Sequence, residues 1–569
     1  MTGMLITNYN TDKFLLSKYN EGDKFIYESK KYSNISIQRL KINKFLNDKL
    51  FFENDNYIVL IEGVILNSLE LAKEKNVKTF KDYIEISLKD DNTNFYNNLR
   101  GSFCGYFLNK NNNEAVAFTN HTGDRPLFYY KDDDKYIIAS NIKFILDFLN
   151  VLGKKLTFNK NAVYYMITWG NMIDNSTYAN EIKRLLPGEK IDINKNSFNI
   201  IKYYKFNRHA FDTSKMSDDE IVDKLDELFT KAVNLEYAKD KEYGYNSLAH
   251  LSSGLDCRMS NFIARELGYD NILNLTYTQS NSYDERIAKK MSADLGNESY
   301  IRYMNNPKFI YDVDKVVEKS GGVFIYIGMT NGLRCLEELN TDKIGVLHMG
   351  LIGDVILGTC VKSKKELYKK NYSGAYSKRI ISKFKEQYDE KINEYEDYEM
   401  FYLNTCAFLC NGSFPIIYQD YTEFASPYMY KDFIDFCYAL DVEKRINRYI
   451  YFKWIKTKHH EAGNYEWSGS HVKINSKFYQ LIRILKRIPV KIMRFFGADI
   501  NDMNPFNYWY KSNKDISRFI DTYIATNMNS EYIDLEMRNV LNEFLNGSTC
   551  LEKLQLMTAL SSIKLYFGK

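Results

Sequence analysis

The pattern of apolar residues changes once along this 569-residue chain, between about residues 205 and 216. Before the change, short β-rich runs alternate with turn residues, as in 57–66 and 135–140. After it, segments with helical spacing alternate with short apolar runs, a pattern typical of βαβ units and a parallel sheet. We therefore predict an α+β domain at 1–205 and an α/β domain at 206–569, whose part beyond residue 370 is largely helical.

Charge and cysteine content narrow the class of protein. The 77 Lys and Arg residues nearly balance 73 Asp and Glu, giving a net charge of +4. So small an excess argues against nucleic acid as a partner. Eight scattered cysteines do not form a disulfide framework, and the amino-terminal residues lack a signal-peptide pattern. We expect a cytoplasmic protein.

Two other segments each allow a specific and a plain interpretation. Cys406 and Cys410 lie one helical turn apart, but no further Cys or His completes a metal site, which favours two buried small side chains. Residues 482–497 alternate basic and apolar residues around Pro489. A membrane surface or an acidic partner could bind such a segment, but its apolar face is short, which favours short solvated helices.

The second domain is predicted to begin with a long helix. Ser217 and Glu220 form a capping box ahead of apolar residues at helical spacing. Strands are expected at 247–251, 272–276 and 344–349.

The first of these strands runs directly into a turn of small residues and then a helix. The turn reads Ser252-Ser253-Gly254-Leu255-Asp256-Cys257-Arg258, and apolar residues at helical spacing follow it. Backbone N–H groups at such a helix start suit a polyphosphate, and Asp256 suits a magnesium ion. The plain alternative is a tight βα turn with a capping serine.

A second loop strengthens the nucleotide interpretation. The strand 344–349 ends in Gly350-Leu351-Ile352-Gly353-Asp354, again glycines followed by an aspartate. Ligands of open α/β sheets bind at the carboxyl ends of the strands, so Asp256 and Asp354 are expected to face one crevice.

Together the two loops resemble the S-G-G-L-D-S pyrophosphate loop and the G-x-G-x-D-E-x-F-G-G segment of the asparagine synthetase family, whose relatives include β-lactam synthetases and lasso-peptide cyclases. The resemblance implies a PP-loop synthetase domain of the adenine nucleotide alpha hydrolase type, with ATP and Mg²⁺. It implies that Asp256 and Asp354 bind the metal. The nucleotide-binding residues that it implies are Ser252, Ser253, Gly254, Leu255, Asp256, Cys257, Thr276 and Gly350.

This chain departs from that pattern at three loop positions. Ser253 replaces a glycine, Cys257 replaces a serine and Val355 replaces an acidic residue. Neither aspartate is lost, but a thiol is a weaker donor than a hydroxyl, so nucleotide binding could be weakened.

Two catalytic residues are carried over from the resemblance. Glu318 lies within one residue of the position at which the family has a glutamate, and this resemblance implies that it accepts a proton from the attacking amine. A surface glutamate on a helix is an equally good interpretation. The segments 283–286 and 425–429 resemble the family's acidic segment and its proline-centred substrate segment. The family's catalytic lysine is hard to place, and our choice is Lys473.

The resemblance extends over the first domain, in residues such as Arg39, Gly63 and Gly101, and implies an N-terminal-nucleophile αββα sandwich of the class II glutaminase type. Glutamine hydrolysis there needs an amino-terminal cysteine, but position 2 is Thr2. The oxyanion-hole Asn-Gly becomes Glu62-Gly63, which puts a carboxylate where negative charge would develop. We therefore expect an inactive glutaminase domain that serves as a scaffold, in which Arg39 is paired on the surface, rather than a Thr2 nucleophile.

These features predict an AMP- and pyrophosphate-forming ligase that joins a small-molecule or peptide carboxylate to an amine or ammonia, as a possible homodimer. The resemblance leaves open an intramolecular amide-forming enzyme of the lasso-cyclase or β-lactam-synthetase kind. A tRNA-modifying enzyme with the same loop is disfavoured by the charge balance. A non-catalytic nucleotide-binding or interaction protein is the other alternative.

Overall fold

The computed structural model of the chain describes residues 1–20, 22, 24–90, 93–372, 374–477, 479 and 503–568. The basic segment predicted at 482–497 lies outside these residues.

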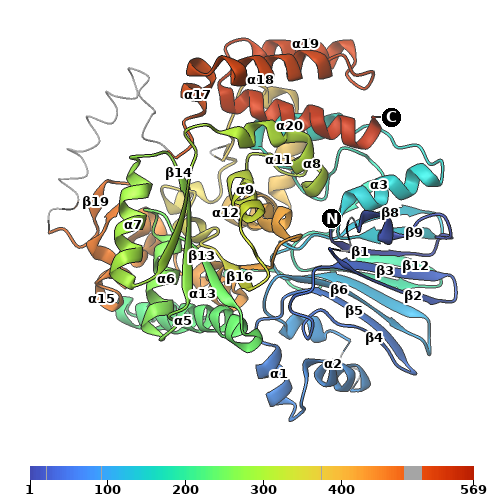
Figure 1. The fold of residues 1–569 in the computed structure, drawn as a ribbon, viewed down its shortest axis with the longest axis horizontal. Coiled ribbons are helices and arrows are strands. Elements are labelled where there is room, and N and C mark those ends of the chain that lie inside the picture. Colours follow the sequence, from blue (N-terminus) through green and yellow to red (C-terminus); the bar gives the residue numbers. More distant parts are fainter. Residues whose placement is uncertain are drawn as a thin grey trace.

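The amino-terminal part contains two antiparallel six-stranded sheets (Figure 1). The strand order of the first sheet is β10 (Ile182–Arg184), β8 (Phe128–Asp132), β9 (Lys135–Ala139), β1 (Gly3–Thr7), β3 (Ile35–Lys41) and β2 (Ile26–Tyr32). The order of the second is β12 (Ser197–Lys202), β11 (Glu189–Asn194), β7 (Glu114–Thr119), β6 (Phe103–Asn109), β5 (Tyr57–Gly63) and β4 (Phe51–Glu53). The β-rich runs predicted at 57–66 and 135–140 correspond to β5 and β9.

Apolar residues pack these sheets into four layers. Side chains such as Met4 and Leu60 fill the space between the sheets. The outer face of the second sheet packs against α1 (Ser68–Glu74) and α2 (Phe80–Lys89). The outer face of the first packs against α3 (Ile142–Val151) and α4 (Lys160–Trp169). This is the αββα sandwich of the N-terminal-nucleophile type, as the sequence predicts.

The second part begins with α5 (Asp218–Tyr243), whose first turn has the expected capping box between Ser217 and Glu220. Its sheet is parallel throughout, in the order β15 (Glu298–Tyr303), β14 (Ile272–Thr278), β13 (Asn246–His250), β16 (Ile344–His348) and β17 (Phe424–Ala425). The predicted α/β fold is therefore present, and three of the five strands were located from the sequence.

Both faces of the parallel sheet are covered. Alternate residues of β13 show this, since Ala249 packs in one apolar cluster and Leu248 in another. The cluster around Ala249 includes residues of α5, α6 (Asp256–Glu266) and α7 (Tyr283–Leu295). The cluster around Leu248 includes α9 (Thr330–Glu338).

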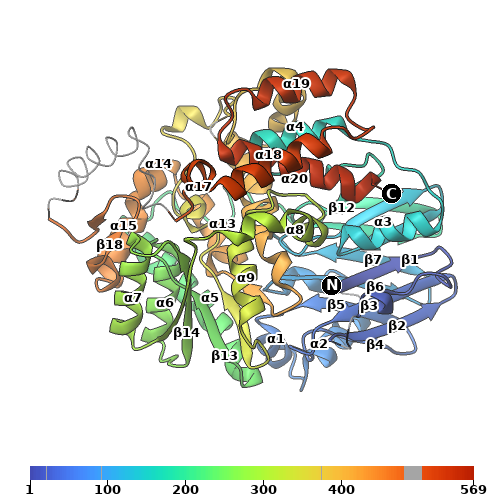
Figure 2. The same ribbon diagram turned by 45° about the horizontal axis from the view of Figure 1, so that its top comes forward.

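Most of the chain beyond residue 370 is helical, as predicted. The last four helices lie over α8 (Val313–Ser320) and α4 (Figure 2). They are α17 (Phe506–Ser512), α18 (Lys514–Asn527), α19 (Leu535–Leu545) and α20 (Cys550–Phe567). Because α20 packs on both α4 and α8, it joins the sandwich to the parallel-sheet part.

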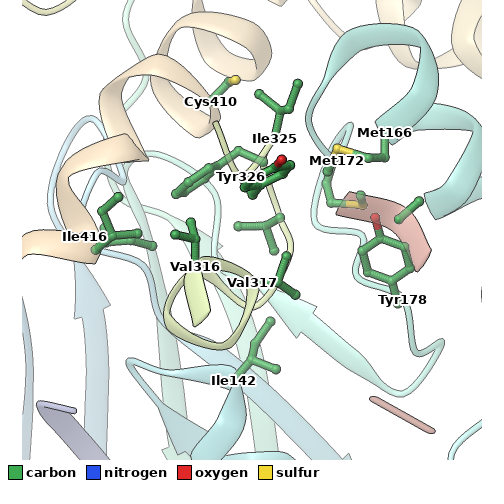
Figure 3. Close-up of a cluster of buried hydrophobic side chains, with 14 of the residues drawn as sticks. Ile142, Met166, Met172, Tyr178, Val316, Val317, Ile325, Tyr326, Cys410 and Ile416 are labelled. Carbon is green, nitrogen blue, oxygen red and sulfur yellow. The ribbon is translucent and has the colours of Figure 1, made fainter. Parts of the chain in front are cut away.

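The two parts share one apolar core (Figure 3). Met166 and Tyr178 of the sandwich part lie in the same cluster as Val316, Tyr326 and Ile416. The described stretch Tyr398–Tyr418 is long and apolar enough to cross a membrane, but 83% of that apolar window is buried inside the protein. This stretch is therefore part of the protein interior.

Candidate functional site

The point where the connections of the parallel sheet diverge lies between β13 and β16. The chain leaves β13 towards β14 and β15 on one side, whereas β16 and β17 extend the sheet on the other. Loop 251–255 follows β13, and loop 349–352 follows β16. Such a divergence opens a crevice at the carboxyl ends of the two strands, where α/β proteins bind ligands.

Glycines allow the two loops to touch. A Cβ atom on Gly350 would lie 2.4 Å from the backbone nitrogen of Cys257, and one on Gly353 would lie 2.5 Å from Cγ of Asp256. Both separations are too short for real side chains, so these positions need glycine. Ile352 between them has a φ of 57°, an unfavourable conformation for a β-branched residue.

This contact brings the two predicted metal ligands together. The Asp354 backbone N–H donates a 3.0 Å hydrogen bond to Oδ2 of Asp256, and the Tyr451 hydroxyl donates to Oδ1 at 3.1 Å. Burial, reinforced by the charge of Asp354, raises the pKa of Asp256 above its ordinary value. A divalent cation between such carboxylates would relieve this cost, so the pair fits Mg²⁺.

The start of α6 also suits a phosphate. The residue at the N-cap position, Leu255, makes no side-chain hydrogen bond to the first N–H groups of α6. Ser252 and Gly254 are partly exposed. Ser253 is buried and instead uses its N–H and hydroxyl on Oδ1 of Asp284, at 2.9 and 2.5 Å.

Arg258 fixes the shape of this loop. Its buried guanidinium donates to the carbonyls of Ser253 (2.9 Å), Ala462 (3.0 Å) and Glu466 (2.7 Å). It thereby ties the loop to the hairpin of β18 (Glu466–Trp467) and β19 (Val472–Lys473).

Lys473 and Glu318, the residues predicted to be catalytic, are placed differently. Lys473 is exposed on this hairpin, paired in register with Glu466. Glu318 lies on α8, which packs against α20 and α3, and its carboxylate pairs with Lys143 of the sandwich part at 3.8 Å. The structure thus brings Asp256, Asp354, Gly350 and the 252–257 loop together, while the ion pair of Glu318 is made with the other part of the chain.

Thr276 and Cys257 also have defined surroundings. The Thr276 hydroxyl donates to the carbonyl of Leu251 at 2.7 Å, which braces the strand end beneath the loop. Burial raises the pKa of the Cys257 thiol to about 12, so the sulfur is protonated at neutral pH.

Sequence patterns gave no role to four residues that shape this site, namely Asp284, Arg258, Tyr451 and Arg448. Arg448 lies at φ 59°, stacks over Trp467 at 5.3 Å and lowers the pKa of Asp256, against the larger effect of burial. Arg448 lies near Asp256 only in the folded chain, because the two residues are far apart in the sequence. The one available signal was the predicted acidic segment 283–286, which contains Asp284.

In the sandwich part, the residues at positions that match a glutaminase site take part in buried ion pairs. Arg39 is fully buried and pairs with Glu28 at 2.5 Å and with Glu62 at 3.6 Å. The expectation that Arg39 is paired on the surface was therefore wrong about its burial.

A residue of the second part completes this buried charge network. Glu423 contacts Arg125 and Lys49 at 2.5 and 2.6 Å, and Arg125 also contacts Glu62 at 3.4 Å. Although burial opposes it, Arg125 and Lys49 hold the pKa of Glu423 below its usual range. Nearby, the Thr2 N–H donates to Oδ1 of Asp420 at 2.8 Å.

Comparisons with known proteins agree with this architecture. The profile of the glutamine amidotransferase domain family matches residues 38–147. The glutamine-hydrolysing asparagine synthetase 1 of Bacillus subtilis (strain 168) is 23% identical over 277 residues, which are 47% of this chain and 42% of that protein. A Methanocaldococcus jannaschii protein, named as a candidate glutamine-hydrolysing asparagine synthetase 2, is 23% identical over 49% of this chain and 54% of its own. The chain thus matches about half the length of these relatives.

Solved structures with some likeness include the allosteric regulatory enzyme of purine biosynthesis (TM-score 0.21, 13% identity, 53% of this chain and 74% of that one). Another is the NH3-dependent NAD synthetase of Campylobacter jejuni (TM-score 0.18, 17% identity, 33% of this chain and 90% of that one).

Proposed function

Because the chain is asparagine synthetase-like, we propose that it is an ATP-dependent ligase that forms an amide bond, with residues 1–205 as a scaffold domain and residues 206–569 as the catalytic domain. The reaction would activate a carboxylate by adenylation, with release of pyrophosphate. An amine or ammonia would then displace AMP. The carboxylate is a small molecule or a peptide.

The meeting of the two loops is the observation that carries this proposal. Asp256 and Asp354 are joined by a 3.0 Å hydrogen bond between the backbone of one and the carboxylate of the other, beside the start of α6. A phosphate chain with its magnesium ion needs both features within one crevice. The plain alternative, a βα turn with a capping serine, explains neither the contact between two carboxylate-bearing loops nor the absence of a side-chain cap.

In this proposal each group has a separate task. Asp256 and Asp354 would hold Mg²⁺, which would neutralise charge on the β- and γ-phosphates. Backbone N–H groups of residues 255–257 would bind the pyrophosphate that leaves, since the Gly254 N–H donates to Oγ of Ser252 at 3.2 Å. Arg448, and Lys473 if its hairpin closes on the loop, would offset negative charge at the reacting carboxylate. Glu318 remains a candidate base only if α8 moves towards the crevice.

Two observations support a nitrogen source other than glutamine. Arg39, which matches a glutamine-binding arginine, has its charge satisfied by Glu28 and Glu62. Glu62 would also oppose the oxyanion that forms during amide hydrolysis. The amine would then come from a separate substrate or from ammonia in solution.

Exchange of radioactive pyrophosphate into ATP tests the proposal, with a panel of amino acids and other carboxylic acids as substrates. We expect exchange with at least one acid, reduced about 100-fold or more in Asp256→Asn and in Asp354→Asn, since each removes metal-binding charge. Asp270→Asn, an exposed aspartate before β14, is the matched control. Undiminished exchange in either loop variant would remove the assignment.

A nucleotide-binding protein without catalysis is a second candidate, favoured by one contact. The Ser253 N–H is already used by Asp284, so the loop offers one donor fewer to a phosphate. Mg²⁺-dependent binding of α,β-methylene-ATP in calorimetry, without exchange for any acid of the panel, would identify this case.

A further inference from the structure

A strongly basic segment follows the second of the two loops. Residues 362–385 contain nine Lys or Arg residues and a single acidic residue, Glu366. The whole chain has a net charge of only +4, so the chain outside this segment is net acidic. The positive charge of the protein is therefore concentrated in a segment that begins eight residues after Asp354.

The basic side chains of this segment lie at the protein surface, and most have no acidic partner. All nine are exposed. The carboxylate of Glu366 accepts a 2.9 Å hydrogen bond from the backbone N–H of Lys362. Within the described part of the chain, the lysines of this segment that form no ion pair are Lys362, Lys365, Lys369, Lys378 and Lys383.

Acidic residues follow the segment at 386–399, but they leave these five lysines unpaired. Asp389 contacts Lys370 and Lys385 instead, at 3.5 and 3.7 Å. Asp397 pairs with Arg208 at 2.7 Å. The excess of positive charge therefore remains at the surface of residues 362–385.

Contacts near both ends hold the segment against the rest of the protein. Near its start, Lys364 pairs with Asp441 at 2.6 Å, and the Leu367 side chain is buried. Near its end, Arg379 pairs with Glu552 of α20 at 3.1 Å. A surface held in this way loses less conformational freedom when a partner binds it.

A groove adjoins the first half of the segment. Its volume is about 440 Å³, and Lys364, Leu367 and Tyr368 line it together with residues that include Tyr438 and Leu440. All of its lining residues belong to the second part of the chain. The Tyr368 side chain is 73% exposed. An exposed ring beside a groove of this size fits an apolar side chain of a partner.

The groove distinguishes between the anionic partners that a basic surface attracts. Asp212 and Asp441 also line it, and they would repel the closely spaced phosphates of a nucleic acid. A flat membrane surface does not enter a concave site. An acidic peptide supplies carboxylates for the lysines and an apolar side chain for the groove, so it matches both features.

The segment also leads to the candidate site. Lys362 and Asp354 are separated by eight residues, which span at most about 28 Å of extended chain. A peptide that lies along the segment therefore reaches the loop of Asp354 with roughly eight further residues or fewer.

We propose that residues 362–385 and the adjoining groove bind an acidic peptide segment of the carboxylate substrate. The five unpaired lysines attract the peptide, and the groove beside Tyr368 takes one of its apolar side chains. The role of this peptide as substrate rests on the proposed ligase function, but its binding does not.

Fluorescence anisotropy tests the binding with a fluorescein-labelled oligoglutamate of about twelve residues, up to ~40 Å long when extended. We expect binding by the intact chain that weakens as the salt concentration rises. Lys365→Gln combined with Lys369→Gln should weaken it about fivefold, because two exposed charges are lost. Lys13→Gln combined with Lys89→Gln, at two exposed lysines of the sandwich part, is the matched control and should bind like the unmodified chain. Equal affinities of the two double variants would overturn the proposal.

A second probe, the same peptide with one central phenylalanine, tests the groove. We expect it to bind more tightly than the plain oligoglutamate. Tyr368→Ala should weaken its binding about threefold through the loss of a ring contact, and should leave the binding of the plain oligoglutamate unchanged. An equal change for both probes would overturn the assignment of the groove.

Two competitors test the class of partner. Oligothymidylate with the same number of charges, and vesicles that contain phosphatidylserine, should displace the phenylalanine probe less effectively than unlabelled peptide does. Stronger displacement by either competitor would overturn the choice of a peptide.

The same variants separate this inference from the ligase proposal. Pyrophosphate exchange with a free acid should be unchanged in the Lys365 and Lys369 double variant, because neither lysine contacts the two loops. Exchange in a protein that binds neither probe would make this inference fail alone. Probe binding without exchange for any acid or peptide would make the ligase proposal fail.

Discussion

The molecule contains two sites with opposite electrostatics. Around Glu62, every carboxylate has a cationic neighbour, because Arg39, Lys49 and Arg125 neutralise Glu62 and Glu423. At the carboxyl edge of the parallel sheet, Asp256 and Asp354 lie beside each other, and burial together with that neighbouring charge raises the pKa of Asp256. Internal pairing is typical of a structural role, whereas unrelieved like charge is typical of a ligand site.

The comparison also shows how the two parts of the chain are joined. Within the four-layer sandwich, the buried charges pair with one another and with Glu423 of the other part. The same residue thereby fastens the two parts together. This internal pairing supports the proposed scaffold role of the sandwich.

The largest expected effect is on stability, from Glu423→Gln. This change removes the closest carboxylate from the buried charges of Arg125 and Lys49 and leaves them only their longer contacts to Glu62, at 3.4 and 4.0 Å, which costs about 3–5 kcal/mol. A lower midpoint in urea unfolding measures it, and Glu531→Gln, on the surface, should shift the midpoint by no more than about 0.5 kcal/mol. An unchanged midpoint for Glu423→Gln would show that the network is not structural.

The next largest effect is expected on pyrophosphate exchange, from a change at the contact between the two loops. Gly350→Ala would place a Cβ atom 2.4 Å from the Cys257 nitrogen and force the loops apart. Displacement of this order reduces catalysis by roughly 100-fold, so we expect pyrophosphate exchange to fall by about that factor.

Gly153→Ala is the control for this change. Its Cβ would meet nothing within 4 Å, and its φ of 66° adds a backbone strain that Gly350 does not have. Equal activity in the two alanine variants would mean that the loop contact has no function.

A smaller effect is expected from Asp284→Asn. The asparagine oxygen can still accept from the Ser253 N–H and hydroxyl, but the negative charge beside the phosphate loop is removed. We expect Mg²⁺-ATP to bind about threefold more tightly in calorimetry, the effect of one partly exposed charge. Weaker binding would assign Asp284 to the metal or to the nucleotide instead.

The smallest effect is predicted for Thr2→Ala. If the sandwich is a scaffold, pyrophosphate exchange should stay within about twofold of the unmodified chain, and neither protein should release glutamate from glutamine. Glutamate release that disappears in the variant would revive Thr2 as a nucleophile.

Local sequence signals predicted much of the fold. The capping box at Ser217, the strand at 247–251 and the small-residue turn after it are each encoded within about ten residues, and the structure has all three. The short strand β17 pairs with β16, where Phe424 lies 77 residues after its partner Leu347, and the burial of Arg39 depends on Glu62 of the opposite sheet. No spacing rule contains that information.

The candidate site at the two loops could likewise be predicted from the sequence only in part. Asp256 and Asp354 were paired because both follow strands, a rule that operates at the level of the sheet. Asp284, Tyr451 and Arg448 reach the crevice through the packing of helices and hairpins onto that sheet.

Hydrogen exchange measured by mass spectrometry tests the contrast between the two sites most directly, because it needs no knowledge of the carboxylate substrate. Backbone amides are followed with Mg²⁺ and α,β-methylene-ATP, and separately with glutamine. We expect the nucleotide to protect residues 251–257 and 349–355, and glutamine to protect nothing in residues 38–63. Protection of 38–63 by glutamine, with no effect of the nucleotide on the two loops, would contradict the assignment of the scaffold and the catalytic site.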